Sequence, residues 1–195
     1  MKLFYSIPSK DSERILSCGF SSADYRDGEA VIDEKKVNCL IAYIVPGDVV
    51  IPEGNILLEI DMEAESVCVA EGAFKTAEDS DAQKLYEESF VRLSDYRFGD
   101  YARPECLITS SLLPEQIQRY DGRRGFPLVY ERSESLYEEK TFHKFCEKYG
   151  DIRMYGMRCC CEALHKAGKM SKKRSGVNLV FTDLKTGERF VIPGK

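Results

Sequence analysis

Residues 101–120 read YARPECLITSSLLPEQIQRY, and one acid in this stretch, Glu105, stands directly before a short apolar run. The run ECLI at 105–108 has the length and composition of a buried strand. A polar turn follows, and then a proline-led segment that predicts a short helix over 114–119. The stretch therefore predicts a strand that carries a carboxylate at its start. That carboxylate is either an ordinary strand-edge residue or the acid of an active site.

The segment around residues 3–19 predicts a second strand followed by a helix. LFYSI at 3–7 alternates weakly between apolar and polar residues, and Pro8 ends the predicted strand. Ser9 is a good N-cap for a helix that runs through residues 12–16. Gly19 suits the C-terminal end of that helix.

Three further strands and one helix are predicted before residue 121. CLIAYIV at 39–45 reads as a buried strand, and ILLEIDM and SVCVAEG follow as two more. Residues 77–90 place Ala82, Leu85, Tyr86 and Phe90 on one side of a helix with charges on the other.

The remainder of the chain has a different pattern. DGRRGFP at 121–127 combines glycine, proline and charge, so it is the best candidate boundary. Amphipathic helices are predicted over 133–150 and 151–169, and SKKRSG at 171–176 reads as a linker. Two apolar runs around residues 183–187 then predict a β-hairpin.

Together these patterns predict an α+β fold with a mixed, mostly antiparallel sheet and short helices. We expect one α+β domain over residues 1–125. A helical pair and a β-hairpin over residues 126–195 would form a second part that either packs on the first or binds a partner.

Composition and charge point to a water-soluble protein with an uneven charge distribution. The 195 residues include 43% hydrophobic and 31% charged residues, and the net charge of −5 divides into −10 over residues 1–125 and +5 over 126–195. The longest apolar run has seven residues, well short of the roughly 20 that span a bilayer. We therefore expect a cytoplasmic protein with no membrane partner.

Cysteine and histidine raise the question of a zinc site. The eight cysteines show no CxxC pair, so free thiols are the default expectation. His143 and Cys146 lie three positions apart, and Cys161 and His165 four positions apart, so two helices could offer a Cys₂His₂ tetrahedron to zinc. The simpler interpretation is that two helices pack with cysteine as a small apolar filler. No phosphate loop, GxGxxG, HExxH or GxSxG motif is present.

Three segments resemble ADP-ribosyltransferases. LFYSIPSKDSERILSCGF at 3–20 resembles the opening strand and glycine-terminated helix of that fold, and RPECLITSSLLPEQI at 103–117 resembles its closing strand with a glutamate at the start. AEDSDAQKLYEESFVRLSDY at 77–96 is similar to the acidic segment that DarT-type nucleic-acid ADP-ribosyltransferases place ahead of the catalytic strand. The resemblance covers roughly residues 1–120.

This resemblance implies transfer of ADP-ribose from NAD to a nucleic-acid or protein acceptor. It makes Glu105 the catalytic acid, because a carboxylate can hydrogen-bond the ribose hydroxyl while an oxocarbenium-like cation develops. The first strand of the family offers a histidine or arginine to the dinucleotide. Here Tyr5 and Ser6 occupy that place, and Arg26 is expected to supply the positive charge.

Simpler interpretations stand beside each of these roles. Glu105 could be a solvated edge acid paired with Arg103 or Arg97, Tyr5 a core aromatic, and Arg26 a loop residue in water. The missing basic residue on the first strand favours an alternative function, a non-enzymatic interaction module. The basic C-terminal part of such a module, with the KAGKMSKKRSG segment at 166–176, would bind a protein or nucleic-acid partner.

Overall fold

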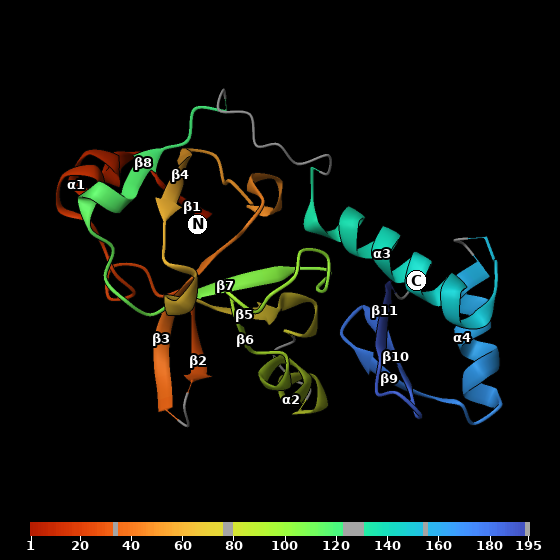
Figure 1. Ribbon diagram of the computed structural model, residues 1–195. Helices are drawn as coiled ribbons and strands as arrows, with labels where there is room; N and C mark the ends of the chain where they lie inside the picture. Colours follow the sequence, from red (N-terminus) through yellow and green to blue (C-terminus); the bar gives the residue numbers. More distant parts are fainter. Residues whose placement is uncertain (33–34, 76–79, 123–130, 154–155, 194–195) are drawn as a thin grey trace.

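The computed structural model describes residues 1–32, 35–75, 80–122, 131–153 and 156–193. These residues form four α-helices and three sheets, and every pairing between their strands is antiparallel (Figure 1). The predicted α+β class with a mostly antiparallel sheet is confirmed. Within the described ranges, no helix is both long enough and apolar enough to cross a membrane.

The first sheet has three strands in the order β1-β4-β8, namely β1 (Lys2–Pro8), β4 (Asn55–Asp61) and β8 (Ile117–Arg119). The predicted strand at 3–7 is confirmed. The predicted helix over 114–119 is wrong beyond its first turn, η5 (Pro114–Gln116). Residues 117–119 instead pair with the free edge of β4, and the β-branched Ile117 enters the core there.

A short helix, α1 (Ser12–Cys18), follows β1 through the turn η1 (Ser9–Asp11). The predicted cap by Ser9 is wrong, because its hydroxyl donates to the carbonyl of Gly54 and Asp11 occupies the N-cap position. Gly19 ends the helix as predicted, with φ of 74°. A Cβ on Gly19 would lie 2.1 Å from the carbonyl oxygen of Leu112, so glycine is required there.

The second sheet has five strands in the order β2-β3-β7-β5-β6. They are β2 (Gly28–Ile32), β3 (Lys35–Ala42), β7 (Pro104–Ile108), β5 (Cys68–Glu71) and β6 (Val91–Arg92). The strand predicted at ECLI is β7, the middle strand, and all of its residues are buried. The strand that carries Glu105 is therefore in the centre of the sheet and not at its edge.

The two sheets meet where β1 passes the end of β3. Phe4 and Tyr43 exchange two backbone hydrogen bonds of 2.7 and 2.9 Å, and one cluster of buried side chains from both sheets lies below this bridge. Three short turns and one helix complete this part of the chain. They are η2 (Pro46–Asp48), η3 (Ala64–Ser66), η4 (Gly72–Phe74) and α2 (Ser80–Glu88).

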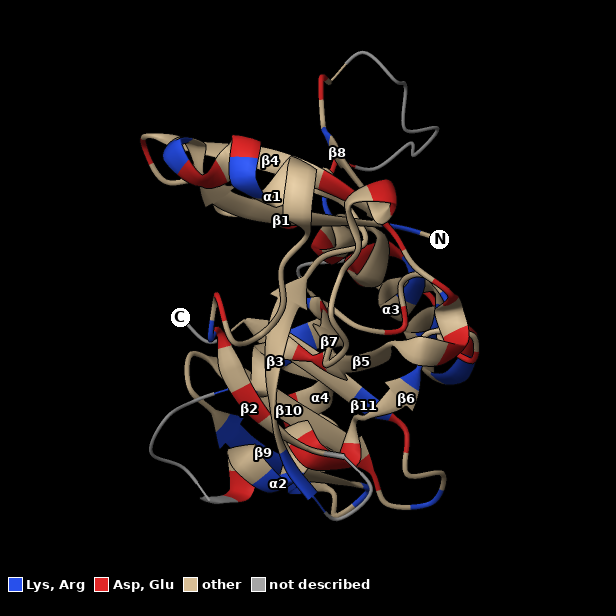
Figure 2. Ribbon diagram, turned by 90° about the vertical axis from the view of Figure 1, so that its left-hand side faces the viewer, with Lys and Arg blue, Asp and Glu red and all other residues tan. Residues whose placement is uncertain are grey.

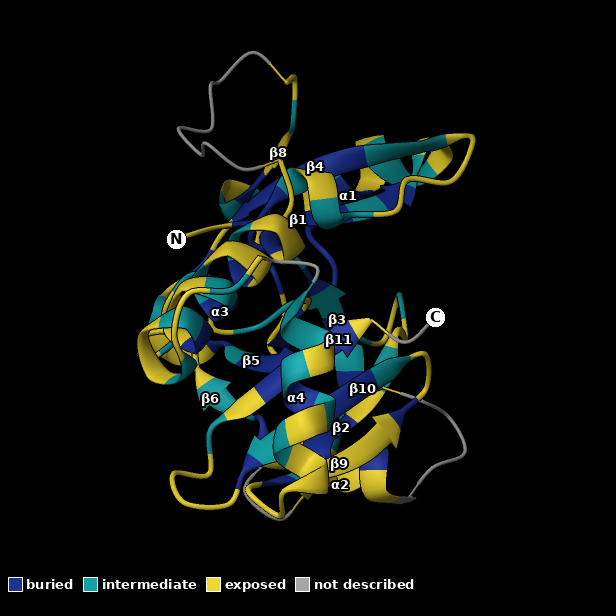
Figure 3. Ribbon diagram, turned by 90° about the vertical axis from the view of Figure 1, so that its right-hand side faces the viewer, coloured by how far each residue is buried: buried dark blue, intermediate teal, exposed yellow. Residues whose placement is uncertain are grey.

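The C-terminal part contains α3 (Ser133–Tyr149), α4 (Met157–Lys166) and a third sheet of β9 (Met170–Ser175), β10 (Asn178–Asp183) and β11 (Arg189–Pro193). The helical pair and the hairpin β10–β11 were predicted. In Figure 3, α4 lies across this sheet with its exposed side outward.

The linker predicted at 171–176 is wrong, because residues 170–175 form β9 and pair along β10. Strand β9 lies beside α2, and Figure 2 shows its basic residues there. Lys173 pairs with Asp81 at 3.2 Å, and Lys172 pairs with Glu162 at 2.6 Å. Two cations of the predicted basic surface are therefore neutralised by acids of the same chain.

The two parts of the chain pack on each other. Tyr137, Val180 and Val191 share a buried cluster with residues of the five-stranded sheet, such as Leu107. The carboxylate of Asp48 also accepts a hydrogen bond of 3.1 Å from the backbone N–H of Ser133, at the start of α3. Most of the boundary predicted at 121–127 lies outside the described residues, and the division into 1–125 and 126–195 stays a prediction.

Candidate functional site

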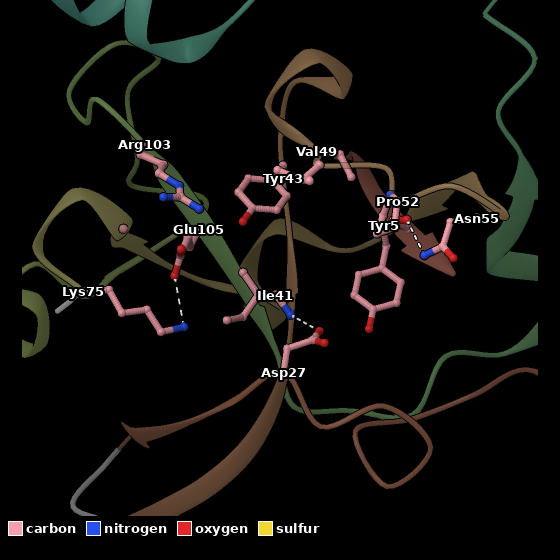
Figure 4. A pocket seen from close by; sticks show the side chains of 13 residues that line it. Tyr5, Asp27, Ile41, Tyr43, Val49, Pro52, Asn55, Lys75, Arg103 and Glu105 are labelled. Carbon is pink, nitrogen blue, oxygen red and sulfur yellow. Dashed lines mark hydrogen bonds and ion pairs between the residues drawn. The ribbon is translucent and has the colours of Figure 1, made fainter. Parts of the chain in front are cut away.

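A cavity of about 430 Å³ opens between the three-stranded and the five-stranded sheet (Figure 4). This volume is within the range of small-molecule sites. We call it the Glu105 pocket. Its lining residues are Tyr5, Ser6, Asp27, Ile41, Tyr43, Val49, Val50, Pro52, Asn55, Gly72, Lys75, Arg103 and Glu105.

The Glu105 carboxylate is the central acid of this pocket. It is only 3% exposed, because Gly72 and Tyr86 pack against its side chain. The hydroxyl of Tyr86 donates to its Oε2 at 3.2 Å, and the Nζ of Lys75 lies 3.5 Å from the same oxygen. Burial raises the pKa of Tyr86, and the charge of Glu105 raises it further, so this hydroxyl keeps its proton and remains a donor.

The wall behind Glu105 is built by the end of β5. Glu71 is 2% exposed, and its carboxylate accepts hydrogen bonds from the backbone N–H groups of Ala102, Arg103 and Ala73 at 2.6, 2.9 and 3.1 Å. Burial raises the pKa of Glu71, and the three donors offset part of the rise. Glu71 therefore fixes the chain that enters β7, two residues before Glu105.

Tyr5 and Ser6 come from β1, on the opposite wall. The Tyr5 ring stacks on Phe20 with 5.6 Å between the ring centroids, so it is a core aromatic as well as a lining residue. Burial raises the pKa of Tyr5, and the neighbouring carboxylate of Asp27 raises it further. The Oγ of Ser6 accepts a hydrogen bond of 3.1 Å from the amide of Asn55.

Arg26 is not among the lining residues of the pocket. Its Nε donates to the Oδ1 of Asn38 at 2.7 Å, and its guanidinium pairs with Glu29 at 3.0 Å on the exposed surface of β2 and β3. The structure thus brings together Glu105, Tyr5 and Ser6 but leaves Arg26 outside.

Two other cations line the pocket: Arg103, which the sequence analysis named only as a partner of a solvated Glu105, and Lys75, which it did not name. Arg103 lies two positions before Glu105, so strand alternation places both side chains on the same face of the sheet. This spacing was a readable signal. Lys75 follows the turn η4, and no local pattern connects it with β7.

The four residues of the predicted zinc site do not form a metal centre. His143 is exposed and lies 3.9 Å from Glu139, whereas the Nδ1 of His165 contacts the carbonyl of Met170 at 2.9 Å. Cys161 is buried in the C-terminal core and Cys146 is half-buried. Across the described ranges, no three His, Cys, Asp or Glu side chains are grouped closely enough to hold a metal ion.

Gly72 provides a direct test of how Glu105 is held. A Cβ at this position would lie 2.6 Å from Oε1 of Glu105 and 2.7 Å from its Cγ and Cδ. We expect Gly72→Ala to displace the Glu105 side chain and to lower the free energy of unfolding by about 1–3 kcal/mol. Thermal denaturation checks the stability, and a crystal structure checks the displacement. Gly156→Ala is a useful control because a Cβ there meets no atom within 4 Å and its φ of −83° suits alanine. An undisplaced Glu105 in Gly72→Ala would contradict this account.

The arrangement as a whole is a buried carboxylate that faces Tyr5 across a cavity, with Tyr43 and two cations at its side. Such a group can stabilise positive charge that develops on a bound molecule, while the cations can hold an anionic part of it. A search of protein-family models, curated proteins and solved structures finds no match to this chain.

Proposed function

We propose that the Glu105 pocket binds NAD and that the protein transfers ADP-ribose to a nucleic-acid or protein acceptor. One observation carries the proposal. The buried carboxylate of Glu105 faces Tyr5 and Ser6 across a single cavity between two sheets. These residues come from the two segments, near the beginning of the chain and around residue 105, whose sequences resemble ADP-ribosyltransferases.

The chemistry needs a carboxylate at the ribose. As the bond between C1′ and the nicotinamide nitrogen breaks, its electron pair leaves with nicotinamide and the ribose acquires oxocarbenium character. A carboxylate hydrogen-bonded to a ribose hydroxyl stabilises this charge. Glu105 suits this role because it is buried, and a low-dielectric surrounding strengthens its interaction with the cation.

The two cations of the pocket, Arg103 and Lys75, would bind the anionic pyrophosphate of NAD. Arg103 lies next to Glu105 on the pocket wall, and a guanidinium binds pyrophosphate oxygens through two parallel hydrogen bonds. The Lys75 side chain is 41% exposed, so it can exchange its contact with Glu105 for a phosphate. Tyr5 presents aromatic surface on the far side of the cavity, where the nicotinamide ring would lie, and Tyr43 lies beside Arg103.

Binding of NAD is the first test. At a concentration of one hundred times its Kd, NAD should stabilise the protein by about 2.7 kcal/mol, which raises the melting temperature by roughly 5–10 °C for a chain of this size. Thermal-shift titration measures this effect. We expect Ser6→Phe to abolish the shift, because the larger side chain fills the cavity.

The matched control is Ser66→Phe, at an exposed position in η3 that does not line the cavity. This variant should retain the shift. An absence of any shift at millimolar NAD would contradict the proposal. An equal shift in both variants would show that NAD binds elsewhere.

A further inference from the structure

A second cavity, of about 560 Å³, adjoins the Glu105 pocket. It lies between the turn η2, the first turns of α3 and the ends of the third sheet, and it shares Val49, Val50 and Arg103 with the first cavity. A molecule bound there would be separated from the contents of the Glu105 pocket only by these shared residues. We call it the α3 cavity.

The α3 side of this cavity carries negative charge without a balancing partner. Glu134 and Glu138 are one helical turn apart and both line it. No ion pair joins either of them to a residue in the described part of the chain. Burial raises the pKa of Glu138, and the nearby charge of Glu134 adds to the rise, as expected for two carboxylates that repel each other.

The two arginines of the α3 cavity have acidic neighbours of their own. Arg103 interacts with the charges of Glu105 and Asp48, and Arg132 also interacts with Asp48. Glu134 and Glu138 are therefore the carboxylates of the cavity that have no side-chain ion pair within the described residues.

Apolar surface surrounds these carboxylates. Val50 is 77% exposed and Val177 is 73% exposed, an unusual degree of exposure for two valines that line one cavity. Tyr137 and Val191 form buried apolar surface further inside. A ligand with an apolar stem and a cationic end would match both features.

We propose that the α3 cavity is the acceptor site and that it takes the arginine or lysine side chain of a peptide. Its role in transfer rests on the function proposed above. The carboxylates of Glu134 and Glu138 disfavour the phosphate backbone of a nucleic acid at this wall of the cavity. Their negative charge attracts a basic peptide.

NAD and the basic side chain of the peptide supply every atom and electron that the transfer step needs. The acceptor nitrogen forms a bond to C1′ of the ribose as the bond from C1′ to the nicotinamide nitrogen breaks. Nicotinamide leaves as a neutral molecule with the electron pair of the broken bond. The acceptor nitrogen releases one proton to water, and no oxidant or reductant is needed.

The test is binding of a short blocked peptide with one arginine flanked by glycine and serine, measured by isothermal titration calorimetry without NAD. The reference is the same peptide with citrulline, which keeps the shape of arginine and lacks its charge. We expect the double variant E134Q/E138Q to bind the arginine peptide about tenfold or more weakly, because two charge-assisted contacts are lost. Wild-type protein should bind the citrulline peptide about tenfold or more weakly than the arginine peptide.

The control double variant is E139Q/E147Q, which changes the same charge on the same helix outside the cavity and should bind as wild type does. Equal binding by E134Q/E138Q, or equal affinity for the citrulline peptide, would overturn the proposal. So would binding of a single-stranded oligonucleotide that the arginine peptide cannot displace. Because NAD is absent, these results do not depend on the thermal-shift test, and each proposal can fail while the other stands.

Discussion

Replacing Glu105 with glutamine should slow the release of nicotinamide from NAD by about 10²- to 10³-fold. Glutamine has nearly the same shape and can accept the hydrogen bond of Tyr86, but it lacks the negative charge that stabilises an oxocarbenium-like ribose. The ion pair with Lys75 adds little to folding, because the lysine side chain is 41% exposed. We therefore expect the free energy of unfolding to stay within about 1 kcal/mol of wild type.

The measurement is a nicotinamide-release assay with thermal denaturation of the same preparation. Glu147→Gln, at an exposed position near the end of α3, makes the same chemical change outside the pocket and should retain wild-type activity. Equal rates in Glu105→Gln and wild type would remove Glu105 from the mechanism. Loss of activity together with loss of folded structure would show that Glu105 is needed for the fold.

Several strands of this fold were predictable from the sequence. The runs at 3–7, 56–62 and 105–108 became β1, β4 and β7, because short apolar segments bounded by turns have few other ways to bury their side chains. The errors at 117–119 and 171–176 have different causes. Residues 117–119 form a strand because β4, from a distant part of the chain, offers its free edge. Residues 171–175 pair with β10, which follows directly along the chain, although their polar and charged side chains are typical of a loop.

The site was predictable where it depends on strand position. Tyr5, Ser6 and Glu105 line one cavity because β1 and β7 belong to sheets that meet at the bridge between Phe4 and Tyr43. Arg103 could have been found from its spacing to Glu105. The sequence could not show whether Lys75 or Arg26 lies near Glu105. Lys75 follows a turn and Arg26 precedes a hairpin, and tertiary packing sets where each of these lies relative to β7.

Replacing Glu71 with glutamine should lower the free energy of unfolding by about 2–4 kcal/mol. Both carboxylate oxygens of Glu71 accept backbone N–H groups, from Ala73 and Arg103 on one oxygen and from Ala102 on the other. Glutamine has one oxygen, so its NH₂ group must face an N–H donor in a buried place. Hydrogen bonds to a charged acceptor are worth roughly 1.5–3 kcal/mol each, and a buried donor without an acceptor is destabilising. The melting temperature should fall by roughly 5–15 °C.

The same substitution should also slow nicotinamide release, by about tenfold, because the chain segment that Glu71 holds leads directly to Arg103 and Glu105. Glu71 does not line the cavity, so it acts as a positioning residue and the Kd of NAD should change less than the rate. Thermal denaturation and single-turnover kinetics separate the two effects, again with Glu147→Gln as the control. Wild-type stability in Glu71→Gln would mean that the three backbone N–H groups find other acceptors. Wild-type kinetics in a destabilised Glu71→Gln would mean that Glu105 keeps its position without the support of Glu71.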